Sequence, residues 1–152
     1  MRTYQKCLIL FLIPLFFASC NSLNKNGVSK KSFFKGIFKA KEVKEGTVVV
    51  YREGSSNNII PAYVKYRIAF STDASGKRSV KITEYTGEVF SGIWTYDDTE
   101  STLVFSSLSP RPASGDFKFD VISVSETEIV LVNQTANPKT GETINQYKLI
   151  PE

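Results

Sequence analysis

AYVKYRIAFS, residues 62–71, alternates between two sets of side chains along its length. One set is Val64, Tyr66, Ile68 and Phe70, and the other includes Tyr63, Lys65 and Arg67. A period of two is that of a β-strand, in which successive side chains point to opposite faces of the sheet. The stretch therefore predicts a half-buried strand with the first set turned toward a core.

The same kind of segment recurs along the chain at short intervals, separated by turn-forming residues. The predicted strands are 37–43, 46–52, 62–71, 78–85, 89–96, 102–106, 116–124, 128–133 and 143–150. After residue 45 no segment has the 3.6-residue apolar period of a helix. Parallel strands need long crossover connections, so tight turns predict an antiparallel meander. We expect an all-β fold of eight to nine short strands closed into a barrel, which removes exposed sheet edges.

Two regions are less regular than the rest of the predicted barrel. Residues 107–115 contain two prolines and no strand pattern, which predicts a long loop. The segment 33–43 fits either a basic interfacial helix, with four apolar residues on one face, or a turn followed by a first strand. Gly36 in its middle disfavours the helix, so we expect the strand.

Residues 1–19 have the composition of a secretory signal. Arg2 and Lys6 precede CLILFLIPLFFA, residues 7–18, which is almost wholly apolar. Twelve apolar residues are too few for a membrane-spanning helix, which needs about 20. Ordinary signal peptidase requires small side chains at positions −1 and −3, and cutting before Cys20 would place the bulky Phe17 at −3.

The residues Phe17-Ala18-Ser19-Cys20 resemble the lipobox of bacterial lipoproteins. The resemblance implies that Cys20 is acylated, becomes the mature N-terminus and anchors the protein to a membrane. Several acyl chains are needed for stable anchoring, since one chain binds only marginally. The alternative is a general secretory signal that leaves Cys20 as a free thiol.

Positive charge is concentrated after the predicted anchor. Residues 25–45 hold seven lysines against two glutamates, whereas the remainder of the chain is slightly acidic. We interpret residues 20–33 as a lipidated, basic, flexible tether and residues 34–152 as one folded domain. The lysines either contact anionic lipid headgroups or simply keep the tether solvated. A slightly acidic exported domain is not expected to bind nucleic acid.

Several short motifs carry a resemblance to a known family. Residues 34–42, FKGIFKAKE, are similar to residues 90–98, FSGIWTYDD, and the chain also contains TEIVL at 127–131 and YKL at 147–149. These motifs resemble those of lipocalin-like lipoproteins of Bacteroidota, which implies a barrel and no established activity. Surface export in that group is associated with acidic residues after the cysteine, and residues 21–25 have none. The resemblance thus implies a lipid-anchored protein that faces the periplasm.

The residue inventory argues against catalysis. The chain has no histidine, and neither cysteine would remain a free thiol after lipid processing, which removes His- and Cys-based nucleophile and zinc sites. Paired-carboxylate chemistry would need two acidic groups to converge in a cleft, and nothing in their spacing requires it. The six carboxylates considered are Glu84, Glu88, Asp97, Asp98, Asp116 and Asp120. We expect neither an enzyme nor a cofactor, metal or catalytic residue.

A barrel of about eight strands is just wide enough to be filled by side chains or to hold one small ligand. Both interpretations use the same inward-facing residues. The candidates for contact with a small apolar or amphipathic ligand are Tyr66, Phe70, Phe90, Trp94, Phe105 and Phe119, with Leu131 beside them. The alternative function is a structural or protein-interaction lipoprotein with a filled barrel.

Overall fold

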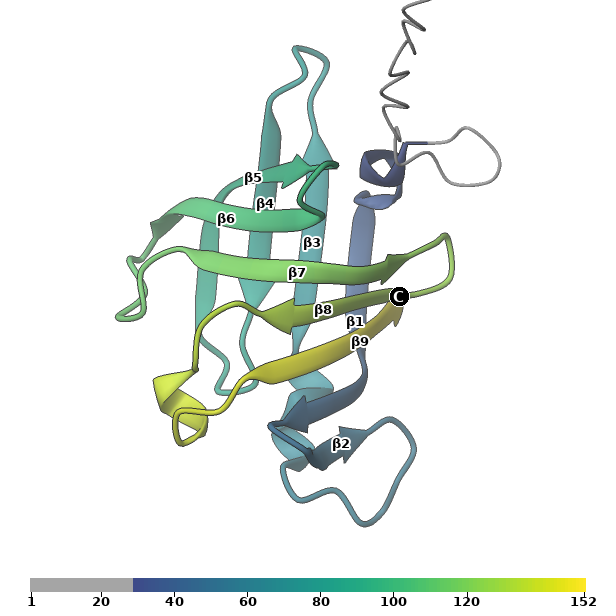
Figure 1. Ribbon diagram of the computed structural model, residues 1–152, viewed down its shortest axis with the longest axis vertical. Helices are drawn as coiled ribbons and strands as arrows, with labels where there is room; N and C mark the ends of the chain where they lie inside the picture. Colours follow the sequence, from purple (N-terminus) through teal and green to yellow (C-terminus); the bar gives the residue numbers. More distant parts are fainter. Residues whose placement is uncertain (1–28) are drawn as a thin grey trace, which may run out of the picture.

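A computed structural model describes residues 29–152 of the chain as an antiparallel β-barrel (Figure 1). The predicted signal peptide, the lipidation at Cys20 and most of the tether lie outside the described residues. Nine strands and three short 3-10 helices make up the described part. The strands are β1 Gly36–Glu45, β2 Val48–Arg52, β3 Arg67–Thr72, β4 Arg78–Thr83, β5 Val89–Asp97, β6 Thr102–Ser109, β7 Phe117–Val124, β8 Ile129–Asn133 and β9 Asn145–Pro151. The 3-10 helices are η1 Lys30–Phe33, η2 Pro61–Lys65 and η3 Pro138–Thr140.

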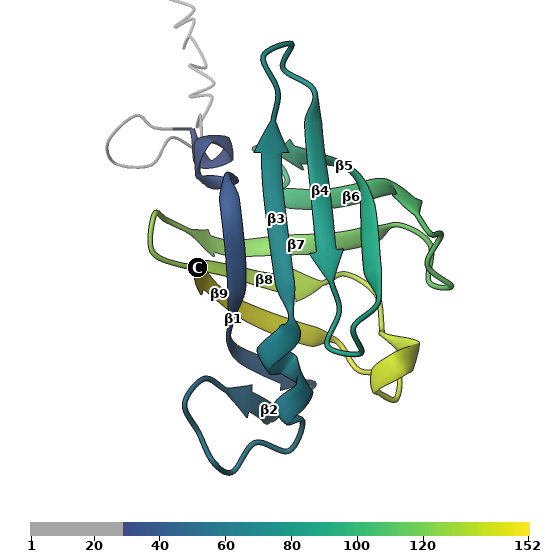
Figure 2. The same cartoon turned by 180° about the vertical axis from the view of Figure 1, so that it is seen from behind.

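Eight of these strands close the barrel, and one lies outside the ring. The hydrogen-bonded order is β2-β1-β3-β4-β5-β6-β7-β8-β9, and β1 also pairs with β9, which completes the circle (Figures 1 and 2). Every pairing is antiparallel. β1 pairs with β3 near its start and with β2 near its end, so β2 is an extra strand on one end of the ring. The predicted fold class, a closed antiparallel meander, is confirmed.

Each of the nine predicted strands is present, including the first one. Gly36 begins β1 with a φ of 81°, a conformation that glycine adopts without the strain that other residues incur. The alternative of an interfacial helix over residues 33–43 is therefore wrong. Phe38 and Trp94, which occupy equivalent places in the two similar segments, are both buried and both pack against Phe70.

The structure corrects the start of the strand predicted at residues 62–71. Residues 61–65 form the 3-10 helix η2, and β3 begins only at Arg67. Pro61 has the fixed φ and the missing N–H that suit a first helical position. The helix changes the direction of two side chains relative to the prediction. Tyr63, predicted to face outward, is fully buried, and Val64, predicted to face the core, is 57% exposed.

A second correction concerns the loop predicted at residues 107–115. β6 continues to Ser109, so the irregular segment begins only at Pro110. A bulge in β6 accompanies this extension, because Ser91 pairs with Ser109 and Ile93 with Ser106, which leaves one extra residue on β6. At the bulge Gly92 lies so close to β6 that a Cβ atom there would be 2.5 Å from the Ser106 carbonyl oxygen. A residue with a side chain cannot replace it without moving the backbone.

Aromatic rings fill the interior along the barrel axis. Phe34 occupies the end from which the N-terminal segment enters, with ring centroids 5.4 Å from Phe70, 5.7 Å from Trp94 and 5.0 Å from Tyr96. Near the other end, Tyr66 stacks on Tyr147 at 4.8 Å. Aromatic pairs at these separations stabilise a core beyond the area that they bury. The domain is thus held by its own packed core.

The basic segment at residues 25–45 is divided between two structural settings. Lys39, Lys41 and Lys44 belong to β1. The Lys39 ammonium pairs with Glu53 at 2.8 Å, and that of Lys41 lies 3.7 Å from Glu128. These three lysines are part of the barrel wall. The other described lysines of the segment, Lys30, Lys31 and Lys35, precede β1, where the chain enters the barrel. Within residues 29–152, no helix has the length and apolar character needed to cross a membrane.

Candidate ligand pocket at one end of the barrel

A pocket of about 340 Å³ lies at the end of the barrel opposite the entering N-terminal segment. Three connections build it: β4–β5 (84–88), β6–β7 (110–116) and β8–β9 (134–144). In an antiparallel meander alternate connections share one end, so the topology brings these three together (Figure 1). The opposite end carries the β5–β6 turn, where the Lys30 ammonium donates to the Ser101 hydroxyl at 3.4 Å. The pocket and the entering chain are therefore separated by the length of the barrel.

The inner wall of the pocket is apolar. The rings of Phe90 and Phe117 meet edge to face, with centroids 5.8 Å apart and an interplanar angle of 87°. Phe90 is buried, and Phe117 is partly buried against the core. Further apolar lining comes from Pro110, Pro112, Ala113, Ala136 and Pro138. Apolar walls with a few polar groups are typical of small-molecule sites, and the volume is at the lower end of their range of about 300–1,000 Å³.

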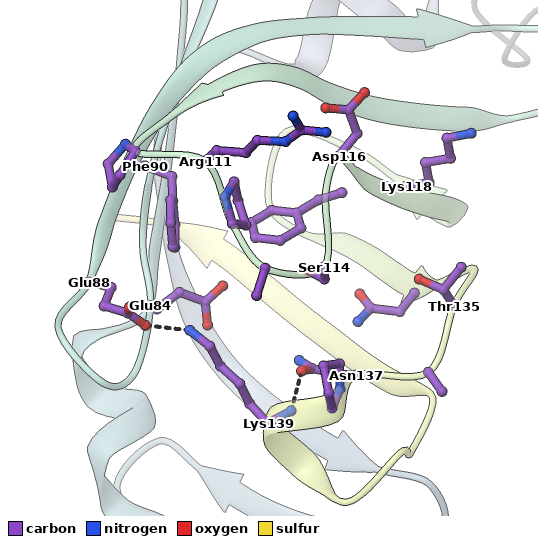
Figure 3. Close-up of a pocket in the computed structure, with 17 residues that line it drawn as sticks. Glu84, Glu88, Phe90, Arg111, Ser114, Asp116, Lys118, Thr135, Asn137 and Lys139 are labelled. Carbon is purple, nitrogen blue, oxygen red and sulfur yellow. Dashed lines mark hydrogen bonds and ion pairs between the residues drawn. The ribbon is translucent and has the colours of Figure 1, made fainter.

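The Glu84 carboxyl group is the buried charged group of the pocket (Figure 3). The residue is only 8% exposed and directly follows β4 at the start of a tight turn, in which the Gly87 N–H donates to the Glu84 carbonyl. Within the described residues, no side chain forms a hydrogen bond or ion pair with its carboxyl oxygens. Burial raises the pKa of Glu84, because removal from water disfavours the charged form.

Glu88, four residues later, has the opposite electrostatic environment. Its carboxylate pairs with the Lys139 ammonium, which joins the β4–β5 turn to the β8–β9 connection (Figure 3). The hydrogen bond from Lys139 lowers the pKa of Glu88. The same ammonium lies 5.7 Å from the ring centroid of Phe90, and the Lys139 backbone N–H donates to the Asn137 side chain at 2.9 Å. These contacts fix Lys139 across the mouth of the pocket.

The remaining charged residues of the pocket lie on its outer rim. Arg111, Asp116 and Lys118 are all exposed to solvent. Figure 3 shows Arg111 and Asp116 on the side of the pocket away from Glu84 and Lys139. Because water and salt screen exposed charges, these groups contribute less to recognition than a buried one.

The six side chains predicted to contact a ligand are all buried, but they occupy different places. Phe90 lines the pocket, whereas the lining does not include Tyr66, Phe70, Trp94, Phe105 or Phe119. Those five, and Leu131, belong to the packed core. The indole N–H of Trp94 donates to the Ser71 carbonyl at 3.3 Å, which supplies the partner that a buried indole needs.

Most of the pocket residues were not predicted from the sequence, because they lie in the connections between strands. Three of the six carboxylates considered for paired chemistry, Glu84, Glu88 and Asp116, line the same pocket. The chain order held a signal for this convergence, since alternate hairpin connections of a meander lie at one end of the barrel. That signal locates the three loops but not the direction in which their side chains point.

The fold is a closed, lipocalin-like antiparallel barrel with a pocket at one end. No protein-family profile matches the chain, and no curated protein matches it either. The solved structures that are similar to it include two from Bacteroides. A lipocalin-like protein from Bacteroides uniformis is 12% identical, with a TM-score of 0.43 over 79% of this chain and 99% of that one. An uncharacterized protein from Bacteroides eggerthii is 13% identical, with a TM-score of 0.47 over 78% of this chain and 99% of that one.

Proposed function

We propose that the barrel binds a small amphipathic molecule in the pocket at its mouth. The observation that carries this proposal is the combination, in about 340 Å³, of the aromatic wall of Phe90 and Phe117 with the charged groups around it. Such a surface matches a molecule with one apolar and one polar part. We propose binding rather than catalysis, and the ion pair of Glu88 with Lys139 supports this, because a paired carboxylate is less available to act on a substrate.

The second part of the proposal is that Cys20 carries the lipid that anchors this barrel to a bacterial membrane, facing the periplasm. The lipobox-like residues Phe17 to Cys20 support it. The geometry of the described part is compatible with that role, because the chain enters the barrel beside Ser101, at the end away from the pocket. An anchor at this end leaves the mouth of the barrel open to solution.

Extraction of the purified full-length protein with organic solvent, followed by mass spectrometry, tests the binding role. The wild type should release a small amphipathic molecule at a stoichiometric level. Ala136→Trp places a large ring in the pocket, on a residue outside the core cluster, and should release much less of that molecule. Because both proteins carry the same covalent anchor and the same bulk lipid, equal extracts from the two would refute binding in this pocket.

Cys20→Ser tests the anchor separately from the pocket. The variant should leave the membrane fraction or retain its signal peptide, since the acyl chains and the processing step both require the sulfur atom. The wild type serves as the comparison in the same fractionation. Unchanged membrane association together with normal cleavage of the signal would refute the proposal.

A structural or protein-interaction role is the second candidate, and two observations favour it. Aromatic side chains fill the barrel interior, and apolar side chains are exposed around β2 and η2, at Val48, Ile59 and Val64. This role predicts a specific partner that is lost in Ile59→Ser/Val64→Ser and retained in Ala136→Trp. The reverse pattern would favour ligand binding in the pocket.

A further inference from the structure

We propose that the ligand of this pocket carries a protonated amine that pairs with the Glu84 carboxylate, with its apolar part against Phe90 and Phe117. This inference deepens the proposed function and rests on it. It specifies which kind of amphipathic molecule the pocket selects: an organic cation, in preference to a neutral molecule or an anion of the same shape.

Glu84 has no side-chain partner within the described residues. The side chain is more than nine-tenths buried, and Figure 3 shows its carboxyl group turned toward the interior of the pocket. A buried charged group without a partner is costly, and the cost is recovered when a ligand supplies a complementary group. Within residues 29–152, no side chain hydrogen-bonds to it or forms an ion pair with it, so a ligand can supply that group.

The charges around Glu84 also favour a cationic ligand. Lys139 lowers the pKa of Glu84 through its charge, but burial outweighs this effect, and the Lys139 ammonium forms its ion pair with Glu88 instead. Ionised Glu84 therefore places a negative charge at the inner wall that has no ion-pair partner within the described residues. A ligand ammonium would neutralise it, whereas a ligand carboxylate would add repulsion between like charges in a region of low dielectric.

The aromatic wall of the pocket favours a cation as well. The Lys139 ammonium already lies within cation–π range of the Phe90 ring, at 5.7 Å from its centroid. The faces of aromatic rings carry negative partial charge, so this wall favours a cation and disfavours an anion. The cations at Arg111 and Lys118 lie on the exposed rim, where solvent weakens any competing preference for anions.

Three probes with a similar apolar body test the inference on the full-length protein: 2-phenylethylamine, 2-phenylethanol and 3-phenylpropanoate. Affinities are measured by calorimetry, and perturbed amide signals of Phe90 and Phe117 locate the binding. We expect the amine to bind at least about tenfold more tightly than the alcohol, since charge-assisted hydrogen bonds are roughly twice as strong as neutral ones. The propanoate should bind more weakly than either.

Glu84→Gln keeps the shape of the side chain and removes its charge. It should bring the affinities for the amine and the alcohol to within about threefold of each other, because a neutral amide gives no charge-assisted bond to the amine. Glu126→Gln, an equally conservative change on the exposed β7–β8 turn, should leave the amine preference intact. An amine preference that survives Glu84→Gln would overturn the inference.

Failure of this inference is distinguishable from failure of the proposed function. Binding of the alcohol or the propanoate at Phe90 and Phe117, with no preference for the amine, would overturn the amine selectivity and retain amphiphile binding. Absence of binding by all three probes would also overturn the inference. The solvent-extraction comparison with Ala136→Trp would then decide separately whether the pocket holds any molecule.

Discussion

Phe34 should be the first residue of the described part whose side chain contributes strongly to the free energy of unfolding. The substitution Phe34→Ala tests this directly. The side chain is 2% exposed and contacts the rings of Phe70, Trp94 and Tyr96 at centroid distances of 5.0 to 5.7 Å. Truncation removes the buried ring, leaves a cavity and breaks three aromatic contacts. We expect a loss of about 3–5 kcal/mol in the free energy of unfolding, as is typical of buried Phe→Ala changes.

The adjacent residue provides the matched control. Phe33 ends η1 and is only partly buried, so Phe33→Ala should cost well under half as much. Urea denaturation measures both free energies. For a domain of this size, the loss at Phe34 corresponds to a fall in Tm of about 12–20 °C. Equal losses at the two positions, or a loss below about 1 kcal/mol at Phe34, would refute the assignment of Phe34 to the core.

Three further predictions concern the bulge, the buried amide and the buried carboxyl. Gly92→Ala should destabilise the domain by about 1–3 kcal/mol in urea denaturation, because the added Cβ would lie 2.5 Å from the Ser106 carbonyl oxygen. Asn145→Ala should cost about 1–3 kcal/mol in the same assay, since it leaves two threonine hydroxyls without their buried acceptor. Glu84→Gln should gain stability relative to wild type as pH rises above 4.5, the ordinary pKa of glutamate, because only the wild type must then ionise a buried carboxyl group.

The direction of the pH effect follows from the raised pKa of Glu84. The folded state retains the proton to higher pH than the unfolded state does, so the contribution of this group to stability falls from pH 4.5 upward until the folded-state pKa is passed. Glu88 has a lowered pKa and acts in the opposite sense, but it is present in both proteins and cancels in the difference. A stability difference between Glu84→Gln and wild type that does not change with pH would contradict burial of Glu84. For the Gly92→Ala experiment, the control is Ser91→Ala, a change at an exposed neighbouring residue.

The strands could be predicted because each one carries its own signal. Ile68 and Phe70 alternate with smaller or polar neighbours in β3, and this local period predicts both the strand and its inner face. The same signal failed at Val64, where Pro61 turns the chain into a 3-10 helix and places Tyr63 in the core instead. Alternation of apolar and polar residues alone does not predict where the backbone changes from a 3-10 helix to a strand within a few residues.

The pocket could not be predicted by the same means, because its charges derive their properties from contacts across the fold. Glu84 and Glu88 are four residues apart in one turn and have the same side chain, yet their pKa values move in opposite directions. Burial raises the pKa of Glu84, whereas Lys139, fifty-one residues after Glu88 in the sequence, lowers the pKa of Glu88 through a hydrogen bond that Glu84 does not receive. The selectivity inferred for an amine thus depends on which glutamate the lysine reaches, and this is a property of the closed barrel rather than of any local motif.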